Sequence, residues 1–233
     1  MKTNKETKSP KLIIIIAESE IEPIPKSIQH HPQIKSYVKK KNKQASNVLL
    51  DASYHHASMK KLQDWSRRGR PDIVHRCVLF ALDSWANHEG LLKIYIHTRN
   101  DYVITINPKT RLPRQYHRFI GLIEQLLETK QICFSDEILL TYEKKTLKQL
   151  LEEQKGEAVL LWEKGKLISI VDLIESKKGF PLIVVIGGFP HGDFHQAHRL
   201  IEQKFSIESE SYTASYLTAK TLITFEQVGC NHK

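Results

Sequence analysis

The sequence predicts an α/β fold in which helices flank a parallel sheet. Two strands, expected at 11–17 and 182–186 from their apolar runs, carry most of this prediction. Unbroken, mostly β-branched runs are typical of strands buried on both faces, and such strands occur in parallel sheets covered by helices. The other strand patterns alternate with helical periods along the chain, which favours α/β layering.

The remaining elements follow from periodicity and from end signals. Helix starts are expected at Asp51 and Ser169 as N-caps, at Pro71 as a first helical position, and at Pro113. Strands are predicted over 91–97, 102–106, 138–142 and 158–162, with a short extended piece over 205–208. Helices are predicted over 51–59, 72–85, 113–130, 146–154, 169–176, 194–204 and 218–228. Arg99-Asn100-Asp101 is expected to form a tight hairpin turn.

Domain organisation is predicted to be simple. Residues 1–10 are polar and lysine-rich and are expected to form a disordered tail, and 11–233 to form a single domain. Within that domain, 18–47 is expected to be a basic loop or extension. Its cluster of Lys39, Lys40, Lys41 and Lys43 could meet phosphates, although a solvated lysine run is the commoner explanation.

The charge balance points to an anionic partner. The formal net charge is +9, and removing the first eleven residues, which hold four lysines and one glutamate, still leaves +6. Nucleic acid is the first candidate. Cys77, Cys133 and Cys230 show no CxxC spacing, which argues for a reducing compartment and against a zinc or disulfide framework. The run 12–16 is too short to span a membrane, so we expect a soluble intracellular protein without a membrane or metal partner.

A glycine-rich turn follows the second buried run. Gly187, Gly188 and Gly192 surround Pro190 at the expected carboxyl end of a parallel strand, where open α/β sheets bind ligands. The spacing matches neither the dinucleotide fingerprint nor a Walker loop. The turn is therefore predicted to hold an adenosine-sized ligand, and a tight turn without a ligand is the alternative.

Arginines form a second candidate site. Arg70 stands at the mouth of the helix that Pro71 and Asp72 begin, within the basic loop 67–72. Three further arginines, spaced three and four apart, are predicted to project from one side of a helix beside Tyr116 and Phe119: Arg111, Arg114 and Arg118. This arrangement is typical of a platform for phosphates and bases. The alternative is a solvated basic face paired with acids elsewhere in the fold.

The histidine pair His55-His56 is not expected to be catalytic. Neighbours on a helix point about 100° apart, so the two rings cannot easily chelate one metal, and one buried and one exposed ring are expected. A hydrolase using His55 or His191 would need an activated nucleophile, and no serine or cysteine lies in a nucleophile elbow.

Seven motifs, in this order and at these separations, resemble one family. They are 51–59 (DASYHHASM), 69–75 (GRPDIVH), 94–98 (IYIHT), 107–108 (NP), 111–119 (RLPRQYHRF), 187–194 (GGFPHGDF) and 217–219 (LTA). From Lys11 to about Glu226 the chain resembles the archaeal and eukaryotic small-subunit rRNA methyltransferases that act on pseudouridine, the Nep1 or Emg1 family. These belong to the SPOUT class, whose C-terminal chain is threaded into a trefoil knot.

The resemblance implies an activity and its partners. It implies S-adenosylmethionine-dependent methylation of N1 of a pseudouridine in small-subunit rRNA, a role in ribosome biogenesis, and a homodimer. A ribosome-assembly factor that binds rRNA, with methylation secondary or absent, is the alternative. The compact chain suggests an archaeal cytoplasmic member, and a eukaryotic one would be nucleolar.

The resemblance also implies residue roles. Arg70, Arg111, Arg114 and Arg118 resemble the arginines that hold RNA, and Asp72 the acid that steadies Arg70. Gly187 and Gly192 resemble one cofactor loop, with Leu161 as a third contact. A second cofactor loop would comprise Leu217, Thr218, Ala219, Lys220, Thr221 and Leu222. No general base is assigned, and Asp72 is a candidate only if Arg70 does not engage it.

Overall fold

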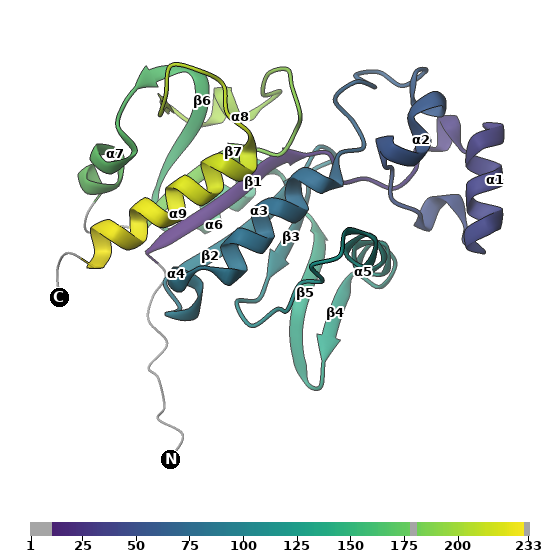
Figure 1. Cartoon of the computed structure of the whole chain (residues 1–233), viewed down its shortest axis with the longest axis horizontal. Helices are drawn as coiled ribbons and strands as arrows, with labels where there is room; N and C mark the ends of the chain where they lie inside the picture. The colour runs from purple at the N-terminus through teal and green to yellow at the C-terminus, as the bar shows by residue number, and fades with distance from the viewer. Residues whose placement is uncertain (1–10, 178–180, 231–233) are drawn as a thin grey trace.

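The structure is a computed structural model that describes residues 11–177 and 181–230, so the predicted tail 1–10 lies outside the described residues. Within the described part, eight strands form one sheet in the order β4-β5-β3-β2-β1-β7-β6-β8 (Figure 1). Their bounds are β1 Leu12–Ser19, β2 Leu92–Thr98, β3 Tyr102–Ile106, β4 Gln131–Phe134, β5 Glu137–Lys144, β6 Glu157–Leu167, β7 Leu182–Gly187 and β8 Gln203–Ser206.

The sheet is mostly parallel rather than wholly parallel. Strands β2, β1, β7, β6 and β8 run parallel, whereas β3, β5 and β4 add an antiparallel edge. The edge follows from the predicted turn at 99–101, which reverses the chain directly into β3, with Asp101 at φ 55°. Strand β4 was not predicted from the sequence, because its side chains are mostly exposed and give no buried run.

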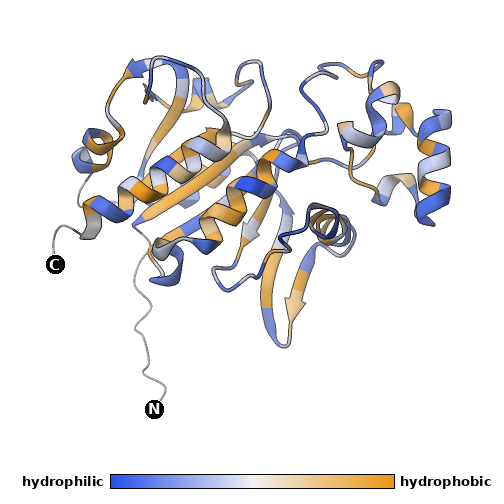
Figure 2. Cartoon of the chain, in the orientation of Figure 1, coloured by the Kyte–Doolittle hydropathy of each residue, from blue (hydrophilic) through white to orange (hydrophobic). Residues whose placement is uncertain are grey.

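Helices cover both faces of the sheet. Their bounds are α1 Pro32–Lys41, α2 Ala52–Met59, α3 Pro71–Asp83, α4 Trp85–His88, α5 Tyr116–Thr129, α6 Leu147–Glu153, α7 Ile170–Ser176, α8 Ala197–Leu200 and α9 Ala214–Cys230, with short 3₁₀ turns at Lys26–Ile28 and Ala45–Asn47. One core joins alternate β1 residues to α3, α5, α7 and α9, and the other joins Ile13 and Ile15 to α6 and α8. Figure 2 shows apolar residues on the sheet beneath α3 and α9. The buried run in β1 therefore serves two cores at once.

The predicted basic extension contains more structure than a loop. α1, α2 and the two 3₁₀ turns enclose their own small core, which includes Ile34, Leu50 and Met59. The Gln33 side chain fastens α1 to α2, since its amide donates to Tyr54 O at 2.8 Å and accepts from Ser58 N at 3.1 Å. We call this part, residues 23–62, the helical module. It lies at the end of the molecule where β1 leaves the sheet (Figure 1).

The helices predicted from caps are confirmed. Asp51 and Ser169 each accept a backbone N–H as N-caps, and Pro71 opens α3. The helix predicted over 146–154 is also present, and its cap, Thr146, had not been predicted as one. The predicted helix 72–85 is interrupted at Ser84, which caps the short α4. The trefoil knot implied by the resemblance stays a prediction.

Three helix boundaries were wrong, and the first two have a tertiary cause. α5 begins at Tyr116 and not at Pro113, because the Pro113 carbonyl binds the His75 ring at 2.8 Å. Of the predicted helix 194–204 only Ala197–Leu200 is helical, since Gln203–Ser206 joins the sheet as β8. The terminal helix begins at Ala214, four residues before the predicted Thr218.

Candidate active site

A cavity of about 600 Å³ lies beside the glycine turn that follows β7. Its walls come from 161–164, 186–194 and 205–217, and from the side chains of Arg70, Ile73 and Arg76 on the opposite side. The volume is that of an ordinary small-molecule site. The cavity therefore lies where the sequence predicted a ligand loop, and it includes one of the predicted RNA-binding arginines.

Glycine is required at two positions of this turn. A Cβ at Gly188 would collide with the side chain and backbone of Ser19 on the neighbouring strand. Gly192 has φ +88°, a backbone conformation that other residues adopt only with strain. We call residues 187–193 the glycine loop. The missing side chain at Gly188 lets its backbone lie close against the end of β1, and the positive φ of Gly192 lets it turn.

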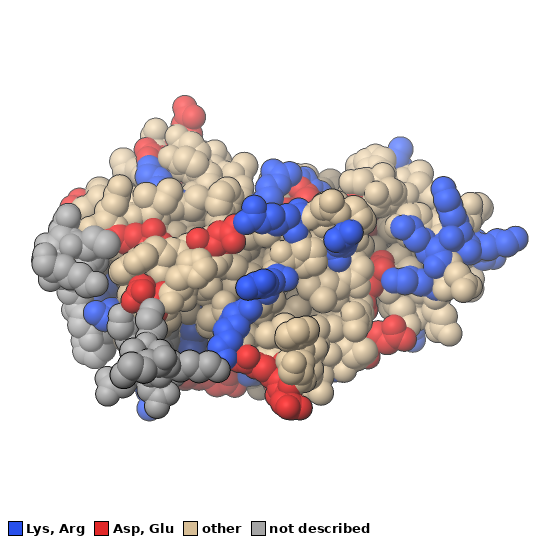
Figure 3. Space-filling view, turned by 60° about the horizontal axis from the view of Figure 1, so that its bottom comes forward, with Lys and Arg blue, Asp and Glu red and all other residues tan. Residues whose placement is uncertain are grey.

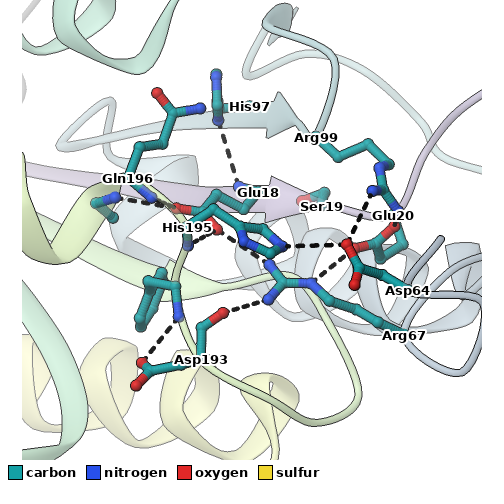
Figure 4. Close-up of polar contacts among 12 residues, drawn as sticks. Glu18, Ser19, Glu20, Asp64, Arg67, His97, Arg99, Asp193, His195 and Gln196 are labelled. Carbon is teal, nitrogen blue, oxygen red and sulfur yellow. Dashed lines mark hydrogen bonds and ion pairs between the residues drawn. The ribbon is translucent and has the colours of Figure 1, made fainter.

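A buried carboxylate holds the far end of the glycine loop. The Glu18 carboxylate accepts the backbone N–H groups of His195, Gln196 and Ala197 at 2.6, 2.9 and 2.9 Å (Figure 4). One carboxylate that accepts three successive N–H groups holds the chain firmly, because a hydrogen bond to a charged group is stronger than one between neutral groups. Because the N–H groups of 195–197 bond to Glu18, α8 begins at Ala197 and not at the predicted residue 194.

Arg67 lies between that carboxylate and the glycine loop. Its guanidinium binds Glu18 at 3.0 Å and Glu20 at 2.8 Å, and it donates to the carbonyl of Asp193. It also stacks on the Phe189 ring, 3.6 Å from the centroid. Burial raises the pKa of Glu20, and the charges of Arg99 and Arg67 oppose that rise. The network was not predicted from the sequence. Its available signal was the alternation of Glu18, Glu20 and Glu22 at and after the end of an apolar run.

Arg70 reaches the cavity in a fixed orientation. Its Nε and Nη2 bind the two carboxylate oxygens of Asp72 at 2.7 and 2.9 Å, and Arg76 adds a contact at 3.2 Å. Burial alone would raise the pKa of Asp72, but the hydrogen bonds and charge of Arg70 outweigh it and the pKa is lowered. Because both oxygens are engaged, Asp72 does not meet the condition set for a general base.

The predicted cofactor residues divide into two groups. Leu161, Gly187, Gly192 and Leu217 line the cavity. The second group does not line it: Thr218, Ala219, Lys220, Thr221 and Leu222. These residues belong to the second turn of α9 and the one after it, so the expected loop is helical. Within α9, the side chains of Thr218, Thr221 and Leu222 are buried, and Lys220 pairs with Glu208.

The other predicted arginines lie outside the cavity. Arg111, Arg114 and Arg118 are exposed, and only Arg118 belongs to α5, so they do not share one helical face. Arg114 pairs with Asp83 at 3.3 Å on the surface. The stretch is nevertheless fastened to α3, because His75 binds Pro113 O and stacks on Phe119 with centroids 4.4 Å apart. Tyr116 Oη binds Asp51 at 2.6 Å, which joins a third motif to the same cluster.

The remaining site predictions concern histidines and metals. His55 is buried and His56 is exposed, as expected. Across residues 11–177 and 181–230, no three His, Cys, Asp or Glu side chains are grouped so that they could hold a metal ion. In the same part of the chain, no helix combines the length and the apolar character needed to cross a membrane.

These features define a class: an α/β protein with a backbone-lined small-molecule cavity and an arginine at its rim. The chain belongs to the EMG1/NEP1 methyltransferase family, whose pattern it matches over residues 14–226. It is 46% identical to the ribosomal RNA small subunit methyltransferase Nep1 of Thermococcus kodakarensis, over 92% of this chain and 97% of the relative. It is 38% identical to the Archaeoglobus fulgidus protein of the same name, over 92% and 95%.

A solved structure supports the same assignment. The crystal structure of Archaeoglobus fulgidus Nep1 bound to S-adenosylhomocysteine aligns with a TM-score of 0.85 and 35% identity. The alignment covers 94% of this chain and 99% of the other.

Proposed function

We propose that this protein transfers a methyl group from S-adenosylmethionine to N1 of a pseudouridine in small-subunit rRNA, and so takes part in small-subunit biogenesis. The observation that carries the proposal is the cavity itself, in which the glycine loop and Arg70 face the same space. A nucleoside cofactor and an RNA base could therefore meet there within one chain.

The residues present fit such a cofactor. Leu161, Leu217 and Phe205 offer apolar surface for an adenine ring, and the glycine loop brings backbone groups to the wall. Asp193, Glu208 and Glu210 also line the cavity. Asp193 and Glu208 are paired with Lys164 and Lys220. Of the three, Glu210 therefore offers its negative charge to a ligand that carries a sulfonium and an ammonium group. Thr218–Leu222 would support this site from behind as part of α9.

RNA would approach over the arginines. Arg70 reaches the cavity, and Arg111, Arg114 and Arg118 offer exposed charges on the stretch that His75 fastens to α3. The lysines of α1 add a second positive region, which forms the basic end of the molecule in Figure 3. Basic surfaces of this kind bind phosphates and position a duplex or loop.

For this reaction the protein must stabilise the charge that develops on the base and must align the reactants. The bound cofactor supplies an electrophilic methyl carbon, and the pseudouridine ring nitrogen must lose its proton during attack. The Arg70 guanidinium, held by Asp72, favours the negative charge that develops on the base. The glycine loop and the opposite wall hold the reactants in line, which contributes most of the acceleration in transfers of this type. The target base leaves its stack to enter the cavity.

A homodimer is part of the proposal. Helices α3, α4 and α9 pack side by side, and the Glu226 carboxylate accepts the Ala86 N–H at 3.0 Å. Their outer surface exposes Phe80, Trp85 and Ile223, to 50%, 37% and 55%. Exposed apolar groups on adjacent helices mark an association surface. Sedimentation of the protein would show a dimer, and Phe80→Glu with Ile223→Glu should give monomers.

The test of the activity uses two transcripts of small-subunit rRNA, one made with uridine and one with pseudouridine throughout. Methyl-labelled S-adenosylmethionine is added with the protein. After digestion the nucleosides, which are isomers of equal mass, are separated by liquid chromatography against standards of N1- and N3-methylpseudouridine and of the methylated uridines. We expect N1-methylpseudouridine from the second transcript and no label in the first. Label in both, or a methyl group on another atom, would refute the proposed specificity. Cofactor-free binding of rRNA with no heat from S-adenosylmethionine would favour the assembly factor.

A further inference from the structure

Arg67 is buried although it belongs to a stretch that the sequence marks as a basic surface loop. Its exposure is 5%, and its carboxylate partners Glu18 and Glu20 are exposed by 1% and 0%. Burying three charged groups is costly, so a cluster of this kind calls for a reason beyond stability. The contacts of Arg67 point to one, because they reach the cofactor side of the cavity.

On one side, Arg67 touches the glycine loop at two places. Its guanidinium lies against the ring of Phe189. It also donates to the carbonyl of Asp193 (Figure 4). Both residues line the cavity. The same guanidinium also binds Glu18, which in turn holds the N–H groups of 195–197. A shift of Arg67 would therefore move the loop that forms the cavity wall.

On the other side, Arg67 is three residues from Arg70, and the backbone between them is stiff. Arg68 binds both oxygens of Glu22 at 2.7 and 2.6 Å. Gly69 has φ +66°, and its carbonyl accepts the Ala52 N–H at 2.9 Å. Segment 67–70 thus behaves as one rigid piece with the glycine loop at one end and the Arg70–Asp72 pair at the other.

We propose that Arg67 is a positioning residue that couples cofactor binding to RNA binding. The inference rests on the proposed function, since it needs a cofactor at the glycine loop and RNA at Arg70. Because segment 67–70 moves as one piece, a ligand that favours the bound position of one end also favours the bound position of the other end, so the two ligands favour each other. By linkage, the factor by which RNA tightens cofactor binding equals the factor by which cofactor tightens RNA binding.

The test compares Arg67→Lys with Arg68→Lys. The two arginines are neighbours, and each binds a buried glutamate of 18–22, but only Arg67 touches the glycine loop. Lysine keeps the charge and loses the planar fork that spans Glu18, Glu20 and Asp193. Calorimetry measures the dissociation constant of S-adenosylhomocysteine with and without the pseudouridine transcript for each protein. The ratio of the two constants is the coupling factor, in which direct effects on cofactor affinity cancel.

We expect the wild type and Arg68→Lys to show a coupling factor of about 5 or more, the usual lower range for coupled sites. Arg67→Lys should fall to about 1 while still binding each ligand alone. Equal coupling in all three proteins, or none in the wild type, would overturn the inference. A wild type that binds neither ligand would instead refute the proposed function.

A second variant tests the inference if Arg67→Lys fails to fold. If Arg67→Lys does not melt cooperatively, Phe189→Leu replaces it, because this change removes the ring under the guanidinium and keeps every ion pair of Arg67. Its coupling factor should also fall below that of Arg68→Lys. An undiminished factor in Phe189→Leu would count against the inference in the same way.

Discussion

Replacing Glu18 by glutamine removes one negative charge and little volume from the buried end of β1. The carboxylate accepts hydrogen bonds from Arg67 and from three backbone N–H groups. A glutamine amide offers only one oxygen, and its NH₂ group would face donors. Arg67 would keep Glu20 as its remaining carboxylate partner.

The magnitude follows from burial, since the Glu18 and Arg67 side chains are exposed by only 2% and 6%. Breaking a buried ion pair on one side costs about 3–5 kcal/mol. For a chain of this size that lowers the melting temperature by roughly 6 to 20 °C. The matched control is Glu143→Gln, which removes a 2.7 Å pair with Lys145 at a side chain that is 51% exposed. Such exposed pairs contribute about 0–1 kcal/mol.

Thermal unfolding followed by circular dichroism measures both variants at one pH and one salt concentration. We expect the melting temperature of Glu18→Gln to lie well below that of the wild type and the melting temperature of Glu143→Gln to lie close to it. If the two variants melt together, the glycine loop does not depend on Glu18 for its position. Glu18 would then not hold the chain that follows the cavity wall.

Three further outcomes follow from exposed and buried charges. Arg114→Ala should weaken RNA binding and reduce the slope of log affinity against log salt by about one, as measured by filter binding, and unchanged salt dependence would exclude a phosphate contact there. The triple variant Lys39→Gln, Lys40→Gln, Lys41→Gln should reduce the slope further without altering the melting temperature, whereas an unaltered slope would mean that α1 carries a solvated lysine run. Burial lowers the pKa of His97, with Asp101 and Glu18 opposing that shift, so His97 is neutral in the fold and takes up a proton on unfolding. Its contribution to stability is complete above about pH 6.5 and declines below it by at most about 1.4 kcal/mol per pH unit. Urea unfolding at several pH values should therefore show a flatter pH dependence for His97→Asn, and an unchanged slope would contradict the shift.

The parts of the fold that were predictable are those with local causes. β1 and β7 follow from β-branched runs, and α2 and α7 from capping residues. The position of the cavity was also predictable, because glycine after a buried parallel strand is a local signal. The start of α5 was not, since the Pro113 carbonyl is taken by a histidine 38 residues away in sequence.

The sequence by itself determined the strand and helix types, the glycine turn and the surplus of positive charge. Only the tertiary structure decided which charged side chains are buried in ion pairs and which remain exposed to solvent. Arg67 and Arg114 are the same residue type in similarly basic stretches, yet one is buried between carboxylates that precede it by 49 and 47 positions and the other stands in solvent. Long-range pairing of this kind depends on which strand ends and loops the folded sheet brings together, and no local sequence pattern encodes that.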